Sequence, residues 1–170
     1  MFHRVIGQFL ENDAELCANI QVKWLENGKP VVDGPLNAKV KVSLSHDERI
    51  CLAVAGKELQ GCDIETIVTH RTLQDWTALL SDSRELLLQQ LFSVEGSVAH
   101  AGTRIWTALE ALRKATGVQD INLAIDSIKG DSVLFYDSVG SKLKVLTFPI
   151  NLTRGSQRMV ALVVQDINPA

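Results

Sequence analysis

The chain has few of the residues that mark metal-rich or disulfide-rich proteins. Its 170 residues include only three cysteines, Cys17, Cys51 and Cys62, which show neither paired metal-ligand spacing nor a dense disulfide pattern. Its four histidines are scattered and lack the spacing of a zinc site. A reducing compartment fits this composition best, so we expect a cytoplasmic protein.

A strong charge of one sign and a long apolar run are also lacking. The 17 basic and 20 acidic residues give a formal net charge of −3, which is no reason to expect nucleic acid or an anionic membrane as a partner. No apolar run approaches the length that spans a bilayer, and acidic residues occur too early for a secretory signal. The 46% hydrophobic content is enough for a substantial core, and we predict one domain over residues 1–170.

Several common catalytic motifs are missing as well. The sequence has no glycine-rich loop ending in GK[ST], no dinucleotide-binding glycine fingerprint and no GxSxG nucleophile elbow. These absences argue against P-loop, Rossmann-type and serine hydrolase chemistry.

The first part of the chain reads as strands. Residues 16–25 predict a strand, and residues 27–35 predict a turn followed by an irregular connection. KVKVSLS from Lys39 alternates, and ICLAVAG from Ile50 is continuously apolar, so we expect two paired strands. GCDIETI from Gly61 predicts one more strand.

The middle of the chain reads as helices, the first two of them short. One is predicted at Leu73 to Leu80, and the second at Ser83 to Phe92 with a serine cap. We expect the apolar face of the second helix to consist of Leu86, Leu87 and Leu91.

The longest predicted helix begins with Thr103 as its cap and ends before Gly117. Ile105, Leu109 and Leu112 form its apolar stripe. Strands return after residue 118 as NLAIDSI, SVLFYDS, KLKVLTF and RMVALVV, separated by turn residues. The order of strands, helices and strands predicts an α+β domain, in contrast to a doubly wound parallel sheet.

Two carboxylates stand two residues apart in GCDIE. On a strand, Asp63 and Glu65 project to the same side, where their mutual repulsion favours a shared cation. Magnesium prefers oxygen ligands and commonly takes one or two carboxylates together with substrate phosphate. On this pair alone, a solvated strand face is the favoured alternative.

Three further residues share one stripe of the longest helix. Trp106, Glu110 and Lys114 are spaced four residues apart, beside the apolar stripe. The alternative is a structural one, in which Glu110 pairs with Lys114 and Trp106 covers the edge of the core.

Three residues near the first strands are candidates for binding an anion. Ser45 and His46 end an alternating strand and offer a hydroxyl and a ring nitrogen. Lys29 lies in a turn beside a proline, where it is a well-placed point charge for phosphate. Each is also an ordinary surface residue in such a position.

Four segments in order resemble the 4'-phosphopantetheinyl transferases. They are NGKP (27–30), VSLSHDERICLAVAG (42–56), GCDIE (61–65) and WTALEALRKATG (106–117). The likeness is to the surfactin-type branch, and within it to the short domains embedded in iterative, enediyne-type polyketide synthases. It covers residues 27–117.

The resemblance implies a fold and a set of site residues. The fold is α+β, with two pseudo-symmetric α/β halves near 1–65 and 66–170, antiparallel sheets, and the active site between the halves. The implied magnesium ligands are Asp63, Glu65 and Glu110, and the residues that hold the phosphates of coenzyme A are Lys29, Ser45, His46 and Lys114.

The implied reaction moves the 4'-phosphopantetheine arm of coenzyme A, the co-substrate, to a serine of an acyl or peptidyl carrier protein, in polyketide or fatty-acid biosynthesis. Magnesium and Lys114 would neutralise the phosphates, Asp63 would hold the metal, and Glu110 or a metal-bound water would accept the serine proton. The expected partners are coenzyme A and an apo carrier protein, without nucleic acid or membrane.

Two other functions remain open. Leu109 stands where the family motif has lysine, and only 26 residues precede Asn27. Both features suit a catalytically weakened module of a polyketide synthase that binds coenzyme A or docks a carrier protein. An unrelated α+β binding domain is the third possibility, and it predicts that Asp63, Glu65 and Glu110 lie far apart.

Overall fold

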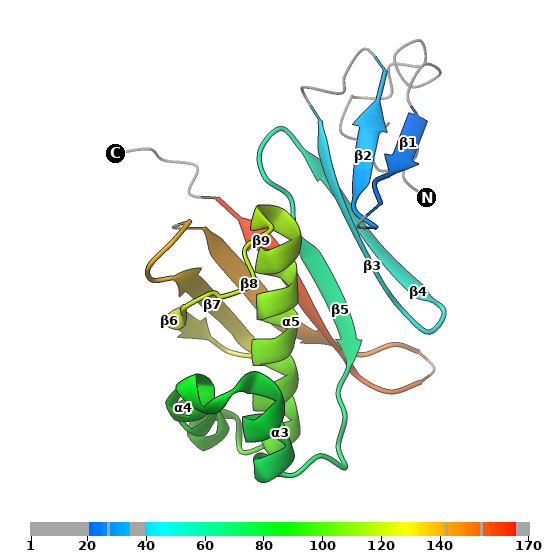
Figure 1. Ribbon diagram of the computed structural model, residues 1–170. Helices are drawn as coiled ribbons and strands as arrows, with labels where there is room; N and C mark the ends of the chain where they lie inside the picture. The colour runs from blue at the N-terminus through cyan, green and yellow to red at the C-terminus, as the bar shows by residue number, and fades with distance from the viewer. Residues whose placement is uncertain (1–20, 27, 35–39, 142, 154, 166–170) are drawn as a thin grey trace.

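The elements of the chain follow the order strands, helices, strands. The structure is a computed structural model, which describes residues 21–26, 28–34, 40–141, 143–153 and 155–165 (Figure 1). The strands are β1 (Gln21–Trp24), β2 (Pro30–Asp33), β3 (Lys41–Asp47), β4 (Ile50–Gly56), β5 (Cys62–Thr66), β6 (Leu123–Lys129), β7 (Ser132–Asp137), β8 (Lys144–Ile150) and β9 (Arg158–Val164). The helices are α3 (Leu73–Leu80), α4 (Glu85–Glu95) and α5 (Val98–Thr116), with a 3-10 turn at Asp82–Arg84 before α4.

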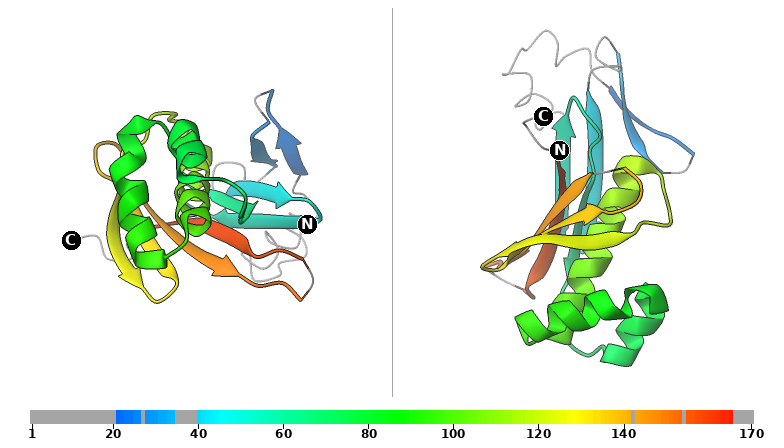
Figure 2. Two further views of the ribbon diagram at one scale, coloured as in Figure 1. Left: turned by 90° about the horizontal axis from the view of Figure 1, so that it is seen from below. Right: turned by 90° about the vertical axis from the view of Figure 1, so that its left-hand side faces the viewer.

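A five-stranded antiparallel sheet in the order β5-β9-β8-β7-β6 forms the centre of the molecule. All three helices lie on one face of it, with α5 along the sheet and α3 and α4 packed at one end of α5 (Figures 1 and 2). The core between the layers includes Trp76, Leu88, Ile105, Leu109, Leu112, Phe135 and Val145. The α+β class and the four strands after residue 118 are confirmed.

Two antiparallel hairpins precede and flank this sheet. The paired strands predicted from Lys39 and Ile50 are confirmed as β3 and β4, although residue 39 lies outside the described range. The irregular connection predicted after the NGKP turn is wrong, because the segment that starts at Pro30 pairs with β1 as β2. Gly28, with φ +77°, closes the turn between them by donating its N–H to the Leu25 carbonyl at 2.9 Å. Of the strand predicted at 16–25, the described part is β1, and residues 16–20 lie outside the described residues.

The helix α3 is confirmed, whereas for α4 the predicted cap is wrong and the predicted apolar face is right only in part: Leu91 is buried and Leu87 packs against the core, but Leu86 does not. Ser83 lies in the 3-10 turn, so Arg84 takes the N-cap position and makes no side-chain cap bond. Leu86 is 81% exposed, while Leu88 and Leu91 are fully buried. The buried pair is three residues apart and faces the core with α5, which leaves Leu86 on the outer side.

The start predicted for the longest helix is also wrong. α5 begins five residues before Thr103, and its cap is Ser97, whose hydroxyl accepts the His100 N–H at 3.3 Å. Thr103 lies inside the helix and is buried. Small residues in the first turns allow this close packing: a Cβ on Gly102 would lie 2.2 Å from the ring of Trp76.

The apolar stripe and the end of α5 are as predicted. Ile105, Leu109 and Leu112 are all buried in the core. Gly117 caps the helix in the left-handed conformation, with φ +76°, where glycine adds no steric cost.

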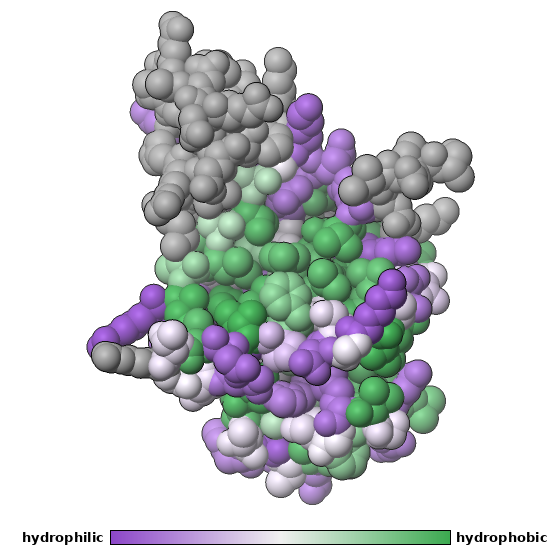
Figure 3. All heavy atoms as spheres, turned by 180° about the vertical axis from the view of Figure 1, so that it is seen from behind, coloured by the Kyte–Doolittle hydropathy of each residue, from purple (hydrophilic) through white to green (hydrophobic). Residues whose placement is uncertain are grey.

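The face of the sheet away from the helices is apolar too (Figure 3). Leu134, Leu146, Leu162 and Cys62 form one row of cross-strand partners on that face. Cys62 is fully buried, and this burial raises the pKa of its thiol to about 11. The thiol therefore stays protonated and unreactive at neutral pH.

The turn between β7 and β8 is built around a buried carboxylate. Asp137 accepts the Ser141 N–H at 2.8 Å and the Val139 N–H at 3.5 Å. Burial acts to raise the pKa of Asp137, but backbone bonds from Ser141, Gly140 and Val139 outweigh it and hold that pKa below its ordinary value.

Asp137→Asn should lower the free energy of unfolding by about 1–3 kcal/mol at neutral pH, because an amide N–H₂ would face backbone donors. Since the pKa is lowered in the folded protein, the wild-type advantage exists above the ordinary value of 3.8 and disappears as the pH falls through the lowered one. Urea unfolding of both proteins at neutral and strongly acidic pH measures this. Asp120→Asn, at a carboxylate that is 97% exposed, is the control, and a difference that persists unchanged in acid would contradict the prediction.

Candidate functional site

Two serines of β3 join the β3–β4 hairpin to the edge strand β5. Ser43 Oγ accepts the Cys62 N–H at 3.2 Å, and Ser45 Oγ accepts the Ile64 N–H at 3.3 Å. Both serines are buried, and their spacing of two matches the spacing of the N–H groups on β5. The two hydroxyl groups thus accept the N–H groups at the free edge of β5, and these bonds hold β3 and β5 side by side.

Asp63 of β5 lies at the centre of this contact and is 2% exposed. Its Oδ1 atom accepts the Ser45 hydroxyl and the Lys114 ammonium, each at 2.7 Å. Burial raises the pKa of Asp63, Lys114 and Ser45 act to lower it, and the charge of Glu110 acts to raise it. Among the described residues, Oδ2 has no hydrogen-bond partner, so this buried carboxylate oxygen is unsatisfied.

Glu65 faces the same helix two residues further along β5. The indole N–H of Trp106 donates a hydrogen bond to its carboxylate. Burial raises the pKa of Glu65, and the charges of Asp63 and Asp47 raise it further. The predicted stripe of α5 therefore faces β5, and the alternative of a solvated strand face is wrong for Asp63.

Glu110 pairs with Arg113, a residue that was not among the predicted site residues. Its Oε1 accepts from Arg113 Nη1 at 2.7 Å, while Lys114 pairs with Asp63. The alternative pair between Glu110 and Lys114 is thus replaced by two other pairs. The spacing of three residues between Glu110 and Arg113 on the helix was the signal for this contact.

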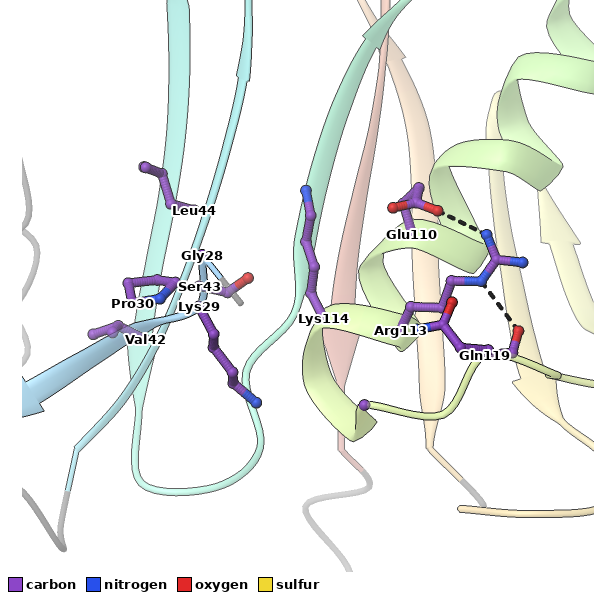
Figure 4. A pocket seen from close by; sticks show the side chains of 11 residues that line it. Gly28, Lys29, Pro30, Val42, Ser43, Leu44, Glu110, Arg113, Lys114 and Gln119 are labelled. Atoms are coloured by element: carbon purple, nitrogen blue, oxygen red, sulfur yellow. Dashed lines mark hydrogen bonds and ion pairs between the residues drawn. The ribbon is translucent and has the colours of Figure 1, made fainter. Parts of the chain in front are cut away.

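A pocket of about 390 Å³ lies between the β1–β2 turn, β3 and the end of α5. Lys29 enters from the turn, and Glu110, Arg113 and Lys114 lie on the α5 side (Figure 4). Gly28, Pro30, Val42, Ser43, Leu44, Gly117 and Gln119 complete the lining.

The structure brings most of the predicted site residues together. Lys29, Glu110 and Lys114 line the pocket, and Lys114 connects it to Asp63. Ser45 and Glu65 lie around Asp63 and are outside the lining. His46 is exposed on the other side of β3 from the two buried serines and is also outside the lining.

The carboxylates are neighbours, but they are not gathered as a ready ligand cluster. Glu110 and Glu65 each interact electrostatically with Asp63. Within the part of the chain that the structure describes, no group of three or more His, Cys, Asp or Glu side chains is arranged to hold a metal ion. The magnesium ligands Asp63, Glu65 and Glu110 therefore stay a prediction. None of the described helices has both the length and the apolar character needed to cross a bilayer.

Comparison with known proteins adds no assignment: no protein-family model matches the chain, and no curated protein matches it.

Gly61 sets the distance between β5 and α5. A Cβ at this position would lie 2.0 Å from the carbonyl oxygen of Ala111 and 2.9 Å from the Ala115 Cβ. The Gly61 carbonyl also accepts the Val163 N–H at 2.8 Å, so the strand cannot easily move away. The glycine of GCDIE is therefore needed for the close approach that lets Lys114 reach Asp63.

Gly61→Ala should lower the free energy of unfolding by roughly 3 kcal/mol, at the upper end of overpacking effects, because the clash is with backbone. Chemical unfolding measures this. Gly130→Ala is the control for a Cβ that meets nothing within 4 Å, although it adds the strain of a positive φ that Gly61 does not have. Equal losses in the two variants would show that the close approach is not tight.

Proposed function

We propose that the chain binds coenzyme A in this pocket and transfers its 4'-phosphopantetheine arm to a serine of a carrier protein. The observation that carries the proposal is the position of Lys114, which lines the pocket and is bonded to the buried Asp63 at 2.7 Å. A cation that can bind phosphate and a carboxylate that can bind a metal therefore lie side by side at the wall of the pocket. The proposed fold is that of the 4'-phosphopantetheinyl transferases, with β3 and α5 contributing from the two halves 1–65 and 66–170.

The lining suits the diphosphate of coenzyme A. Lys29 and Lys114 approach from two different segments, so an anion between them gains charge-assisted hydrogen bonds from both sides. Ser45 has a second role here: its hydroxyl and the Lys114 ammonium share Asp63 Oδ1, which fixes the lysine side chain at the pocket wall. We place His46 at the outer end of the bound molecule, because it is exposed.

The donor set fits magnesium. Asp63, Glu65 and Glu110 offer only carboxylate oxygens, and Asp63 Oδ2 is buried without a hydrogen-bond partner in the described residues. These three residues would hold the ion, and the ion would neutralise negative charge on the transferred phosphoryl group.

In the proposed reaction, the serine oxygen of the carrier protein forms a bond to the β-phosphorus of coenzyme A. The bond from that phosphorus to the bridging oxygen breaks, and adenosine 3',5'-bisphosphate leaves with the electron pair. Glu110 accepts the serine proton, since it lies at the pocket surface and its Oε1 is steadied by Arg113. Lys29 and Lys114 stabilise the negative charge on the leaving group.

The test is incubation of the protein with a fluorescent coenzyme A, magnesium and a panel of apo carrier proteins. Transfer of the label to a carrier serine is the expected result, and EDTA should abolish it. A protein that neither binds coenzyme A nor labels any carrier in the panel would refute the proposal.

The ion pair between Asp63 and Lys114 favours a second candidate function. It compensates the charge of the buried carboxylate without a metal, as a pocket that only binds coenzyme A, or a module that docks a carrier protein in a polyketide synthase, would require. Binding of coenzyme A without labelling of any carrier would support this second function over the first.

A further inference from the structure

Arg113 is held in a fixed orientation at the wall of the pocket. Its Nη1 donates to Glu110 Oε1 at 2.7 Å, and its Nε donates to the Gln119 carbonyl at 3.2 Å. The side chain is 23% exposed and lines the pocket with Lys114 (Figure 4). Within the described part of the chain Nη2 makes no hydrogen bond, so this pre-oriented guanidinium has donors left for a ligand.

The surroundings of Arg113 favour an anion in spite of the helix end. The C-terminal end of α5 is the negative pole of the helix, which by itself repels phosphate. Arg113 and Lys114 occupy the last turn, where positive side chains offset the negative pole of the helix, and Lys29 adds a third cation to the lining. Glu110 is the only acidic residue among the lining residues in the described chain, and Arg113 already pairs with it.

We propose that Arg113 binds a phosphate group of coenzyme A directly. This inference rests on the function proposed above and adds a residue to it. The second N–H of Nη1 and an N–H of Nη2 are not used by the two bonds that orient Arg113. The planar guanidinium therefore still has two donors in one plane for two phosphate oxygens, which the ammonium groups of Lys29 and Lys114 cannot present. Arg113 thereby supplies the geometry of phosphate recognition, and the two lysines supply point charges.

Calorimetric titration with coenzyme A in the absence of a carrier protein tests this directly. Arg113→Ala should weaken binding about 10- to 100-fold, the loss of hydrogen bonds to a charged group. Arg113→Lys should recover only part of the lost affinity, since lysine restores the positive charge but not the planar pair of N–H donors. Lys129→Ala, which removes one exposed cation from the end of β6, is the matched control and should leave affinity unchanged.

A second comparison separates direct contact from an effect through Glu110. In a Glu110→Gln background, Arg113→Ala should still weaken binding by a similar factor. Loss of the effect in that background, or a dissociation constant for Arg113→Ala within twofold of wild type, would overturn the inference.

The titration also distinguishes this inference from the proposed function. Wild-type protein that binds coenzyme A and labels a carrier, with an unchanged Arg113→Ala variant, would reject the role of Arg113 alone. Wild-type protein that does not bind coenzyme A would reject both. Titration with 3'-dephospho-coenzyme A then identifies the phosphate: a penalty of the same size supports contact with the diphosphate, and a vanished penalty supports contact with the 3'-phosphate.

Discussion

Asp63→Asn should reduce the rate of label transfer at least about 10³-fold, the loss of several kcal/mol of charge stabilisation at the phosphates, while the protein stays folded. The amide keeps the shape of the side chain and can still accept the Ser45 hydroxyl through Oδ1. It removes the negative charge from the oxygen that has no partner among the described residues. Burial already raises the pKa of Asp63, so a neutral side chain is tolerated there, and Lys114 is exposed enough to be solvated.

Single-turnover labelling and thermal unfolding of the same samples measure the two effects. Asp82→Asn, at an exposed carboxylate in the 3-10 turn before α4, controls for the change of net charge. Transfer at the wild-type rate would show that Asp63 has only a structural role. A variant that unfolds at ordinary temperature would show that the ion pair with Lys114 is mainly a stabilising contact.

Strands and turns could be predicted where the sequence alternates or has short, bounded apolar runs. β3 follows a period of two, and the strands that do not alternate, such as β4, are short apolar runs bounded by glycine or polar residues. The face of α4 could be predicted only in part, because Leu86, Leu87 and Leu88 are consecutive and leave the phase of the helix open: Leu87 and Leu91 face the core as predicted, and Leu86 does not. Packing against α5 buries Leu88 and exposes Leu86, and only the tertiary structure determines that choice.

The start of α5 could not be predicted for a different reason. Small residues such as Ala101 and Gly102 give no hydrophobic period, although Ala101 is fully buried. They are needed because the ring of Trp76 lies directly against Gly102. The sequence signal for this first part of α5 is its cap, Ser97, whereas the prediction placed the cap at Thr103.

In the site, too, some features could be predicted from spacing and others depend on the tertiary structure. Spacing predicted that Asp63 and Glu65 share one side of a strand, and that Glu110 and Lys114 share one side of a helix. Which charge pairs with which depends on the separation of β5 from α5, which Gly61 makes small. Spacing along the chain does not contain that distance, so the pairing of Lys114 with Asp63 was not foreseen.

Arg104→Met should lower the free energy of unfolding by about 3–5 kcal/mol, the range for breaking one partner of a buried ion pair. Arg104 is 3% exposed in α5 and connects three segments. It pairs with Glu95 at the end of α4, donates to the Thr147 carbonyl at 3.0 Å and hydroxyl at 2.9 Å on β8, and donates to the Asp131 carbonyl at 3.0 Å before β7. Methionine fills similar space and satisfies none of these groups.

We expect the larger part of this loss of stability to come from Glu95, which loses its counterion when Arg104 is replaced. Glu95 has a side chain that is only 11% exposed, and its Oε2 already has no hydrogen-bond partner among the described residues. Without Arg104 it becomes a buried charge with no counterion, so Glu95→Leu combined with Arg104→Met should be clearly more stable than Arg104→Met alone. Urea unfolding of wild type, Arg104→Met, Glu95→Leu and the double variant measures this coupling, with Arg49→Met at an exposed arginine as control. A double variant no more stable than Arg104→Met would place the loss in the bonds to Thr147 and Asp131 and exclude the charge of Glu95 as its cause.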